Sequence, residues 1–218
     1  MAKQAKATPV EDAVEQPQQP SLIILPQQEE QNPMRTIGLI GEVNEEKASE
    51  IIYSILALKH QGKEDEEETV TTSRKPKKKT HKPFELYVST HGGSAADMFA
   101  IYDVMRMVKN DCDITTIGVG KVMSAGVLIL AAGTRGKRKI GKNCRVMIHS
   151  VLGGNEGPLH DLENEMSEIR WTQERYIKAL IEETKLTKSA MDKLLKRHVN
   201  VYLSPEEAVK YGIADEVV

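Results

Sequence analysis

Hydrophobic and polar positions divide the chain from Thr36 onward into short strands and helices. Residues 84–89 alternate between hydrophobic and polar side chains, which is typical of a strand with one buried face. Hydrophobic residues recur at helical spacing over 98–108, and the pattern returns to that of a strand over 114–119. Because strands alternate with helices, the sequence predicts an α/β domain of repeated ββα units.

The remaining elements are predicted in the same way. They are a strand over 37–41, an amphipathic helix over 44–60, a helix that starts at Ser124, a strand over 144–148 and a long helix over about 158–184. Ser204-Pro205-Glu206-Glu207 is a capping box with proline at the first helical position, and Gly212 ends the helix that it begins. In the long helix, an apolar stripe most often faces a core; this stripe consists of Leu159, Leu162, Met166 and Ile169.

Two polar segments depart from this pattern. Residues 1–34 are rich in proline and glutamine, and we expect them to be disordered. Within them, Leu22–Leu25 is a short apolar run that either docks on another surface or is merely sticky. Residues of about 61–82 form a charged insertion with the runs KEDEEE and RKPKKK, which we expect to be a solvated loop. The folded domain is therefore expected to cover 35–218.

Composition limits the cellular compartments and the classes of partner that we expect for this protein. The formal net charge is −2, so the chain has no basic bias toward nucleic acid or membrane, and the insertion's basic run lacks the interleaved aromatics of a nucleic-acid site. The apolar run 122–133 is shorter than the roughly 20 residues that span a bilayer. Cys112 and Cys144 have no metal-ligand spacing. With no signal-peptide pattern at the N-terminus, we expect a cytoplasmic protein without a metal.

Ser124 and His149 are the candidate catalytic pair. Ser124 follows a glycine-punctuated turn and begins a buried helix, and His149 ends a strand-like run just before a diglycine. A serine hydroxyl becomes a nucleophile when an imidazole takes its proton. The resulting oxyanion needs backbone N–H donors, which a helix start and the diglycine Gly92-Gly93 can supply. The alternative is a helix-capping serine and a core histidine with satisfied hydrogen bonds.

Five segments that include these residues closely resemble the ClpP family, the proteolytic subunits of the ATP-dependent Clp protease. They are IGLIGEV (37–43), GGSAADMFAIYDVM (92–105), the Ser124 turn (118–133), GTRGKRKIGKNCRVMIHSVLGG (133–154) and YLSPEEAVKYGIADEVV (202–218). The resemblance implies a ClpP/crotonase-like superhelix with a protruding helical handle. It also implies a serine endopeptidase that degrades unfolded polypeptides to short peptides.

The same resemblance assigns the site. It makes Ser124 the nucleophile and His149 the general base, with the amides of Gly93 and Ala125 as the oxyanion hole. Two strand-like stretches would hold an extended substrate through backbone hydrogen bonds; they consist of Gly93, Ser94, Ala95 and Ala96 and of Ser150, Val151, Leu152 and Gly153. At the position of the family's third catalytic residue, an aspartate, the chain has Asn200. An asparagine can orient His149 but carries no charge to stabilise the imidazolium, and His198 nearby is a poor substitute because it is another base.

The partners follow from the resemblance as well. The family forms a double heptameric ring and receives unfolded chains from a hexameric Clp ATPase, which alone uses ATP, so no cofactor is expected in this subunit. Tyr87 matches one aromatic residue of the ATPase-docking pocket, whereas Glu85 and Lys139 replace aromatic residues with charges, which predicts weak or altered docking. Two alternatives remain: a catalytically weak or inactive ring subunit or adaptor that modulates another ClpP, and a crotonase-type acyl-CoA enzyme.

Overall fold

The computed structural model describes residues 34–63, 81–195 and 200–218. Within them one sheet contains the strands β1 (Thr36–Val43), β2 (His81–Gly93), β3 (Cys112–Met123), β4 (Arg138–Ile140), β5 (Arg145–Ile148), β6 (Val201–Leu203) and β7 (Glu216–Val217). The helices are α1 (Glu45–Gln61), α2 (Ala95–Lys109), α3 (Ala125–Ala131), α4 (Leu159–Glu183), α5 (Lys188–Leu195) and α6 (Pro205–Lys210). The predicted α/β class is confirmed.

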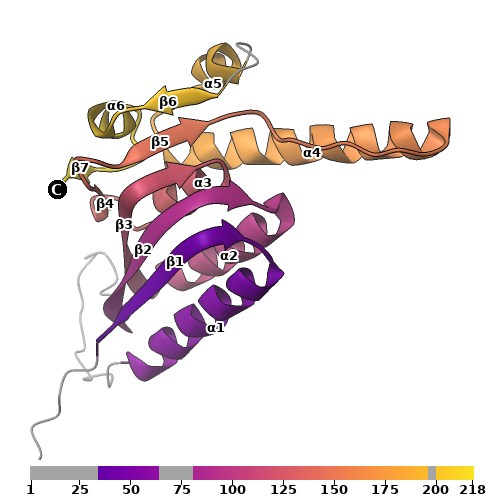
Figure 1. The fold of residues 1–218 in the computed structure, drawn as a ribbon. Helices are drawn as coiled ribbons and strands as arrows, with labels where there is room; N and C mark the ends of the chain where they lie inside the picture. Colours follow the sequence, from indigo (N-terminus) through magenta and orange to yellow (C-terminus); the bar gives the residue numbers. More distant parts are fainter. Residues whose placement is uncertain (1–33, 64–80, 196–199) are drawn as a thin grey trace, which may run out of the picture. The chain divides into compact units, whose positions relative to one another are not determined.

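The sheet is parallel except at one edge. Its strands run in the order β1-β2-β3-β4-β7, while β5 pairs with β3 and carries β6 as an antiparallel neighbour. Helices α1 and α2 lie side by side against β1 to β3, and their apolar faces fill the core with the sheet (Figure 1). Every residue of α3 is buried, so the helix that follows Ser124 is packed on all sides.

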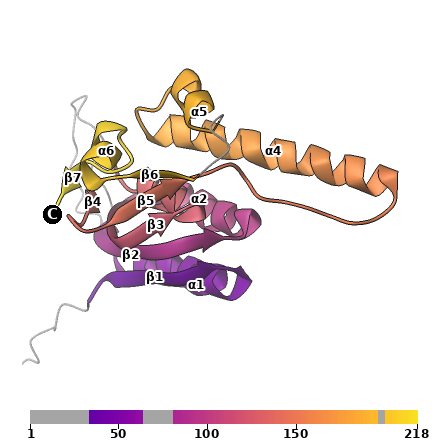
Figure 2. The same cartoon turned by 45° about the horizontal axis from the view of Figure 1, so that its top comes forward.

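Helix α4 has an anchored end and a projecting end. Its N-terminal part and the coil of residues 149–158 run side by side beyond the sheet, and the coil reaches the far tip before the helix begins (Figures 1 and 2). At the other end, the nearly buried carboxylate of Glu183 lies 3.2 Å from Arg106 and 3.0 Å from Lys109 of α2, and it accepts a hydrogen bond from Tyr102. These contacts fix the C-terminal half of α4 to the body of the domain.

The expectation that the apolar stripe of α4 faces a core is wrong. Leu159 is 67% exposed and Met166 is 48% exposed. The reason is their position, because this part of the helix extends past the sheet, and the coil that runs beside it leaves these two side chains exposed. Leu159, Leu162 and Met166 instead form an exposed apolar face on the protruding helix that the resemblance implies, while Ile169 lies against the coil at Gly153.

Several predictions lie outside the described residues. They concern the tail up to residue 33, including Leu22–Leu25, and most of the charged insertion, residues 64–80. The two ends of the insertion do meet, because Lys63 forms a β-bridge with His81. The chain therefore leaves and re-enters the domain at one place. None of the helices in the described ranges combines the length and the hydropathy needed to cross a bilayer.

Candidate active site

The Ser124 turn joins β3 to α3 in an uncommon backbone conformation. Ser124 has φ 52° and ψ −120°, and it is the one non-glycine residue with positive φ in the described part of the chain. Its N–H donates to the carbonyl of Met147 at 2.8 Å, while its own carbonyl accepts from the Val127 N–H at 3.0 Å and from the Tyr176 hydroxyl at 3.1 Å. Such strain persists where the surroundings over-determine it, and here three elements hold the turn.

Two glycines let the end of β2 approach this turn. Gly92 has φ 105°, and a Cβ placed on it would come within 2.5 Å of the Cβ of Ser124. Gly93 has φ 149°, and a Cβ there would lie 2.1 Å from the carbonyl oxygen of Val43. A side chain on Gly92 would push β2 away from Ser124, and one on Gly93 would clash with the backbone of Val43 at the end of β1. The diglycine is therefore required by the packing as well as by the backbone angles.

His149 lies beside Ser124 because their strands are neighbours. β3 and β5 pair in parallel with Met123 opposite Met147, so the residues that follow both strands emerge at the same edge of the sheet. The Nε2 atom of His149 is 2.8 Å from the Oγ of Ser124, within hydrogen-bonding distance. Burial disfavours the charged imidazolium and lowers the pKa of His149 below its ordinary value. A neutral imidazole in this position is able to accept the serine proton.

A cavity of about 420 Å³ opens at this pair. It is lined by His91, Gly93, Ser94, Ala95, Met98, Ser124, Ala125, His149, Ser150, Val151, Leu152 and Tyr176. Both predicted oxyanion-hole residues are among them. Ala125 is the first residue of α3, so its N–H has no acceptor within its own helix. The cavity thus combines a hydroxyl, a base and backbone donors, which is the set that acyl transfer requires.

Two predicted substrate-binding residues do not line this cavity, and neither predicted stretch is a strand, since residues 150–153 are coil and Gly93 is the last residue of β2. β2 ends at Gly93, Ser94 caps α2 by accepting from the N–H of Asp97 at 3.3 Å, and Ala95 and Ala96 form the first helical turn. The capping bond explains why the chain turns into a helix here. Ala96 lines a different cavity.

Gly153 lies against α4 instead of the cavity. A Cβ on Gly153 would come within 2.5 Å of Ile169 Cδ1. Three lining residues were missed by the sequence analysis: His91, Met98 and Tyr176. His91 adjoins the diglycine and could have been found from that motif, whereas nothing in the sequence connects Tyr176 with Ser124.

Asn200 lies close to the site in the chain's fold but forms no described hydrogen bond with His149. It is exposed and directly precedes β6, whose Val201 pairs with Ile148 of β5. Continuing this antiparallel register by one residue would set Asn200 opposite His149. Within the described ranges, however, the His149 ring has its hydrogen bond with Ser124 and none with Asn200. Asn200 therefore stays a predicted third member, and His198 lies outside the described residues.

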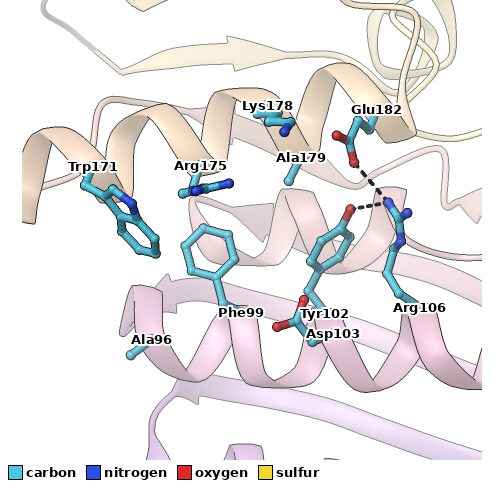
Figure 3. A pocket seen from close by; sticks show the side chains of 10 residues that line it. All are labelled: Ala96, Phe99, Tyr102, Asp103, Arg106, Trp171, Arg175, Lys178, Ala179 and Glu182. Atoms are coloured by element: carbon cyan, nitrogen blue, oxygen red, sulfur yellow. Dashed lines mark hydrogen bonds and ion pairs between the residues drawn. The ribbon is translucent and has the colours of Figure 1, made fainter.

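A larger cavity, of about 640 Å³, lies between α2 and α4 and contains neither the serine nor the histidine. In it Arg106 reaches from α2 to Glu182 of α4 at 3.1 Å (Figure 3). The guanidinium of Arg175 lies 5.0 Å from the centre of the Trp171 ring. This cavity marks the anchored part of the α4 interface, and the smaller cavity holds the Ser124–His149 pair.

Comparison with known families agrees with this site. A family model described as Clp protease matches residues 76–218, which is more than half of the chain and includes Ser124, His149 and Asn200. The chain belongs to the Clp protease family. Membership confirms the resemblance and the fold, and it makes the chain a Clp protease or a relative of one. The Clp protease family is one of ring assemblies that work with ATPase partners.

The lowered pKa of His149 predicts the pH dependence of this Clp protease site. A base acts in its neutral form, and burial keeps His149 neutral to lower pH than an exposed histidine with a pKa of 6.5. We expect the rate of labelling by a fluorophosphonate probe to be constant near neutrality and to fall with acid at a midpoint below 6.5. The measurement is the labelling rate between about pH 5 and pH 8.

His91→Gln is the control, because it removes the second imidazole that lines the cavity. The midpoint of the labelling profile should be the same in this variant as in the wild type. A midpoint above 6.5 would show that His149 is not the titrating base.

Proposed function

We propose that the chain is a serine endopeptidase subunit of a self-compartmentalised Clp protease, degrading unfolded polypeptides to short peptides. The observation that carries this proposal is the 2.8 Å approach of Ser124 Oγ to His149 Nε2 in a cavity that Gly93 and Ala125 also line. Membership of the Clp protease family supports the substrate class. It also argues against the acyl-CoA enzyme as an alternative.

The geometry supports the following steps. His149 Nε2 accepts the Ser124 proton as Oγ bonds to the scissile carbonyl carbon, and the N–H groups of Gly93 and Ala125 bind the oxyanion. The imidazolium then gives its proton to the leaving amine as the C–N bond breaks, which leaves an acyl-serine. A water, deprotonated by His149, releases the acyl group in the second half of the reaction. The backbones of Ser94 and of residues 150–152 border the cavity and would flank an extended substrate.

The proposed assembly is a double heptameric ring in the cytoplasm with a hexameric Clp ATPase as partner. An exposed apolar face on the projecting half of α4 supports contact between two rings, since Leu159 and Met166 have no described neighbour to cover them. ATP would be used by the partner alone, and we expect no cofactor, nucleic acid or membrane contact in this subunit.

The proposed ATPase-docking residue, Tyr87, is 36% exposed on β2. Two charged residues distinguish this surface from the family's aromatic pocket. Glu85 is exposed on the same strand, and Lys139 of β4 pairs with Glu216 at 3.2 Å. Because desolvating these charges costs free energy, an apolar docking loop should bind here weakly.

A second candidate function is a catalytically weak or inactive ring subunit that modulates another ClpP. The observation that favours it is Asn200, an uncharged side chain at the position where the family has aspartate, with no described hydrogen bond to His149. An imidazole whose Nδ1 has no acceptor is free to rotate or to adopt the wrong tautomer.

One experiment separates the two functions. The purified full chain is incubated with a fluorophosphonate probe and, separately, with a fluorogenic peptide, and its size is measured by sedimentation. A peptidase subunit should be labelled at Ser124 and should hydrolyse the peptide. A ring that neither reacts with the probe nor cleaves the peptide would support the modulating subunit and contradict the proposed peptidase.

A further inference from the structure

Helix α4 contacts two walls of the active site from one helical turn. The Oε1 atom of Gln173 accepts a hydrogen bond from the N–H of Val151 at 2.6 Å, and the hydroxyl of Tyr176 donates to the carbonyl of Ser124 at 3.1 Å. Residues three apart share a face of a helix, so both side chains point toward the site. One contact reaches the nucleophile turn, and the other reaches the predicted substrate-binding stretch.

The Tyr176 contact holds a strained turn. Ser124 has a positive φ, and its carbonyl is held by two donors, the Val127 N–H and the Tyr176 hydroxyl. Tyr176 is buried, and burial raises the pKa of its phenol, so the hydroxyl remains a donor at physiological pH. Loss of this bond would let the Ser124 carbonyl turn away, and with it the Oγ that faces His149.

The Gln173 contact determines which backbone groups the substrate meets. With the Val151 N–H bonded to Gln173, this amide is not available to an extended peptide. Gly153, two residues further along, lies against Ile169 of the same helix. The coil is therefore held against α4 at two points, which orient the neighbouring groups of Ser150 and Leu152 at the cavity.

Both contacts depend on a part of α4 that is itself fixed. The helix is tied to α2 about two turns further on, where Arg106 bonds Glu182 (Figure 3) and also the neighbouring Glu183. We propose that Gln173 and Tyr176 are positioning residues, through which α4 sets the nucleophile turn and the substrate-binding coil relative to each other. We name this pair the α4 clamp; it rests on the proposed peptidase function.

The two halves of the clamp should have different kinetic effects. Tyr176→Phe keeps the ring and removes the hydroxyl, so it should lower kcat and the fluorophosphonate labelling rate by about ten-fold or more with little change in KM. Gln173→Leu removes the acceptor for Val151, so it should raise the KM for peptides several-fold and affect labelling far less. The small probe does not need the substrate-binding coil. Gln173→Glu retains an acceptor oxygen and should restore the peptide KM.

Tyr211→Phe is the control, because it removes the hydroxyl of a half-buried tyrosine that packs against the core and lines neither cavity. It should leave the labelling rate unchanged. Hydrogen exchange adds a readout that does not depend on activity, since the Val151 amide should exchange faster in Gln173→Leu and not in Gln173→Glu.

Two results would overturn the clamp, and they are distinguishable. If the wild type cleaves peptides and both Tyr176→Phe and Gln173→Leu match it in kcat, KM and labelling rate, the clamp is wrong and the peptidase function stands. If the wild type shows neither labelling nor hydrolysis, the proposed function fails and the clamp fails with it.

Discussion

Ser124→Ala is expected to abolish peptide hydrolysis while leaving the assembly intact. The hydroxyl that lies 2.8 Å from His149 is removed, and loss of a serine nucleophile costs about 10⁴-fold or more in rate. The side chain of Ser124 makes no capping hydrogen bond to α3, so its loss should not disturb that helix. The measurement is the rate of fluorogenic peptide cleavage, with sedimentation to show that the assembled state is unchanged.

Ser89→Ala is a suitable control, because Ser89 is a partly exposed serine on β2 that does not line the catalytic cavity. It should cleave peptides as the wild type does. A Ser124→Ala protein that retained activity within a few-fold of the wild type would contradict the proposed peptidase function. That function uses as its nucleophile the Ser124 hydroxyl that lies 2.8 Å from His149.

Long elements with a regular hydrophobic pattern could be predicted from the sequence. The helix expected over 98–108 is α2, and the helix expected over about 158–184 is α4, because each carries hydrophobic side chains at helical spacing over several turns. The capping box at Ser204 is present as predicted, since it depends on contacts within four residues. Local chemistry is sufficient for such features.

Elements that depend on distant partners could not be predicted. β4, β6 and β7 have two or three residues each, too few to show a period, and they exist because a neighbouring strand pairs with them. The apolar stripe of α4 showed which face is hydrophobic but not what covers that face. Tyr176 and Ser124 are 52 residues apart in the chain, and no local sequence pattern predicts their contact.

The residues of the candidate site likewise divide into those that local sequence context predicts and those that depend on distant parts of the chain. Ser124, His149 and the diglycine stand in local contexts of strand end, turn and helix start, and these contexts together with the resemblance to ClpP indicated the chemistry. The stretch expected to be strand-like becomes helical at Ala95 and Ala96 because the Ser94 cap begins α2 immediately after β2, although Ala95 still lines the cavity. Asn200 could be placed from the resemblance, but its relation to His149 depends on how β6 continues beyond its first paired residue.

Asn200→Asp is expected to raise peptidase activity by about ten-fold or more, against the roughly 10⁴-fold that the reverse change costs in a serine protease triad. Continued by one residue, the β5–β6 register would set residue 200 opposite His149, where a carboxylate could accept the Nδ1 proton and fix the tautomer that leaves Nε2 free for Ser124. Its charge would also stabilise the imidazolium that forms during attack. The measurement is kcat/KM for a fluorogenic peptide at neutral pH.

The pH dependence of labelling provides a second, independent test of this prediction. Burial lowers the pKa of His149 in the wild type, whereas an adjacent carboxylate favours the imidazolium and raises that pKa. The acid limb of the labelling profile should therefore move to higher pH in Asn200→Asp even as the rate at neutral pH increases. A control is Asn44→Asp, which adds the same charge at the N-cap of α1, where aspartate caps as well as asparagine, and it should change neither quantity. An Asn200→Asp protein with an unchanged cleavage rate and an unchanged acid midpoint of labelling would show that residue 200 does not reach His149. Any weak activity of the wild type could then not be attributed to Asn200.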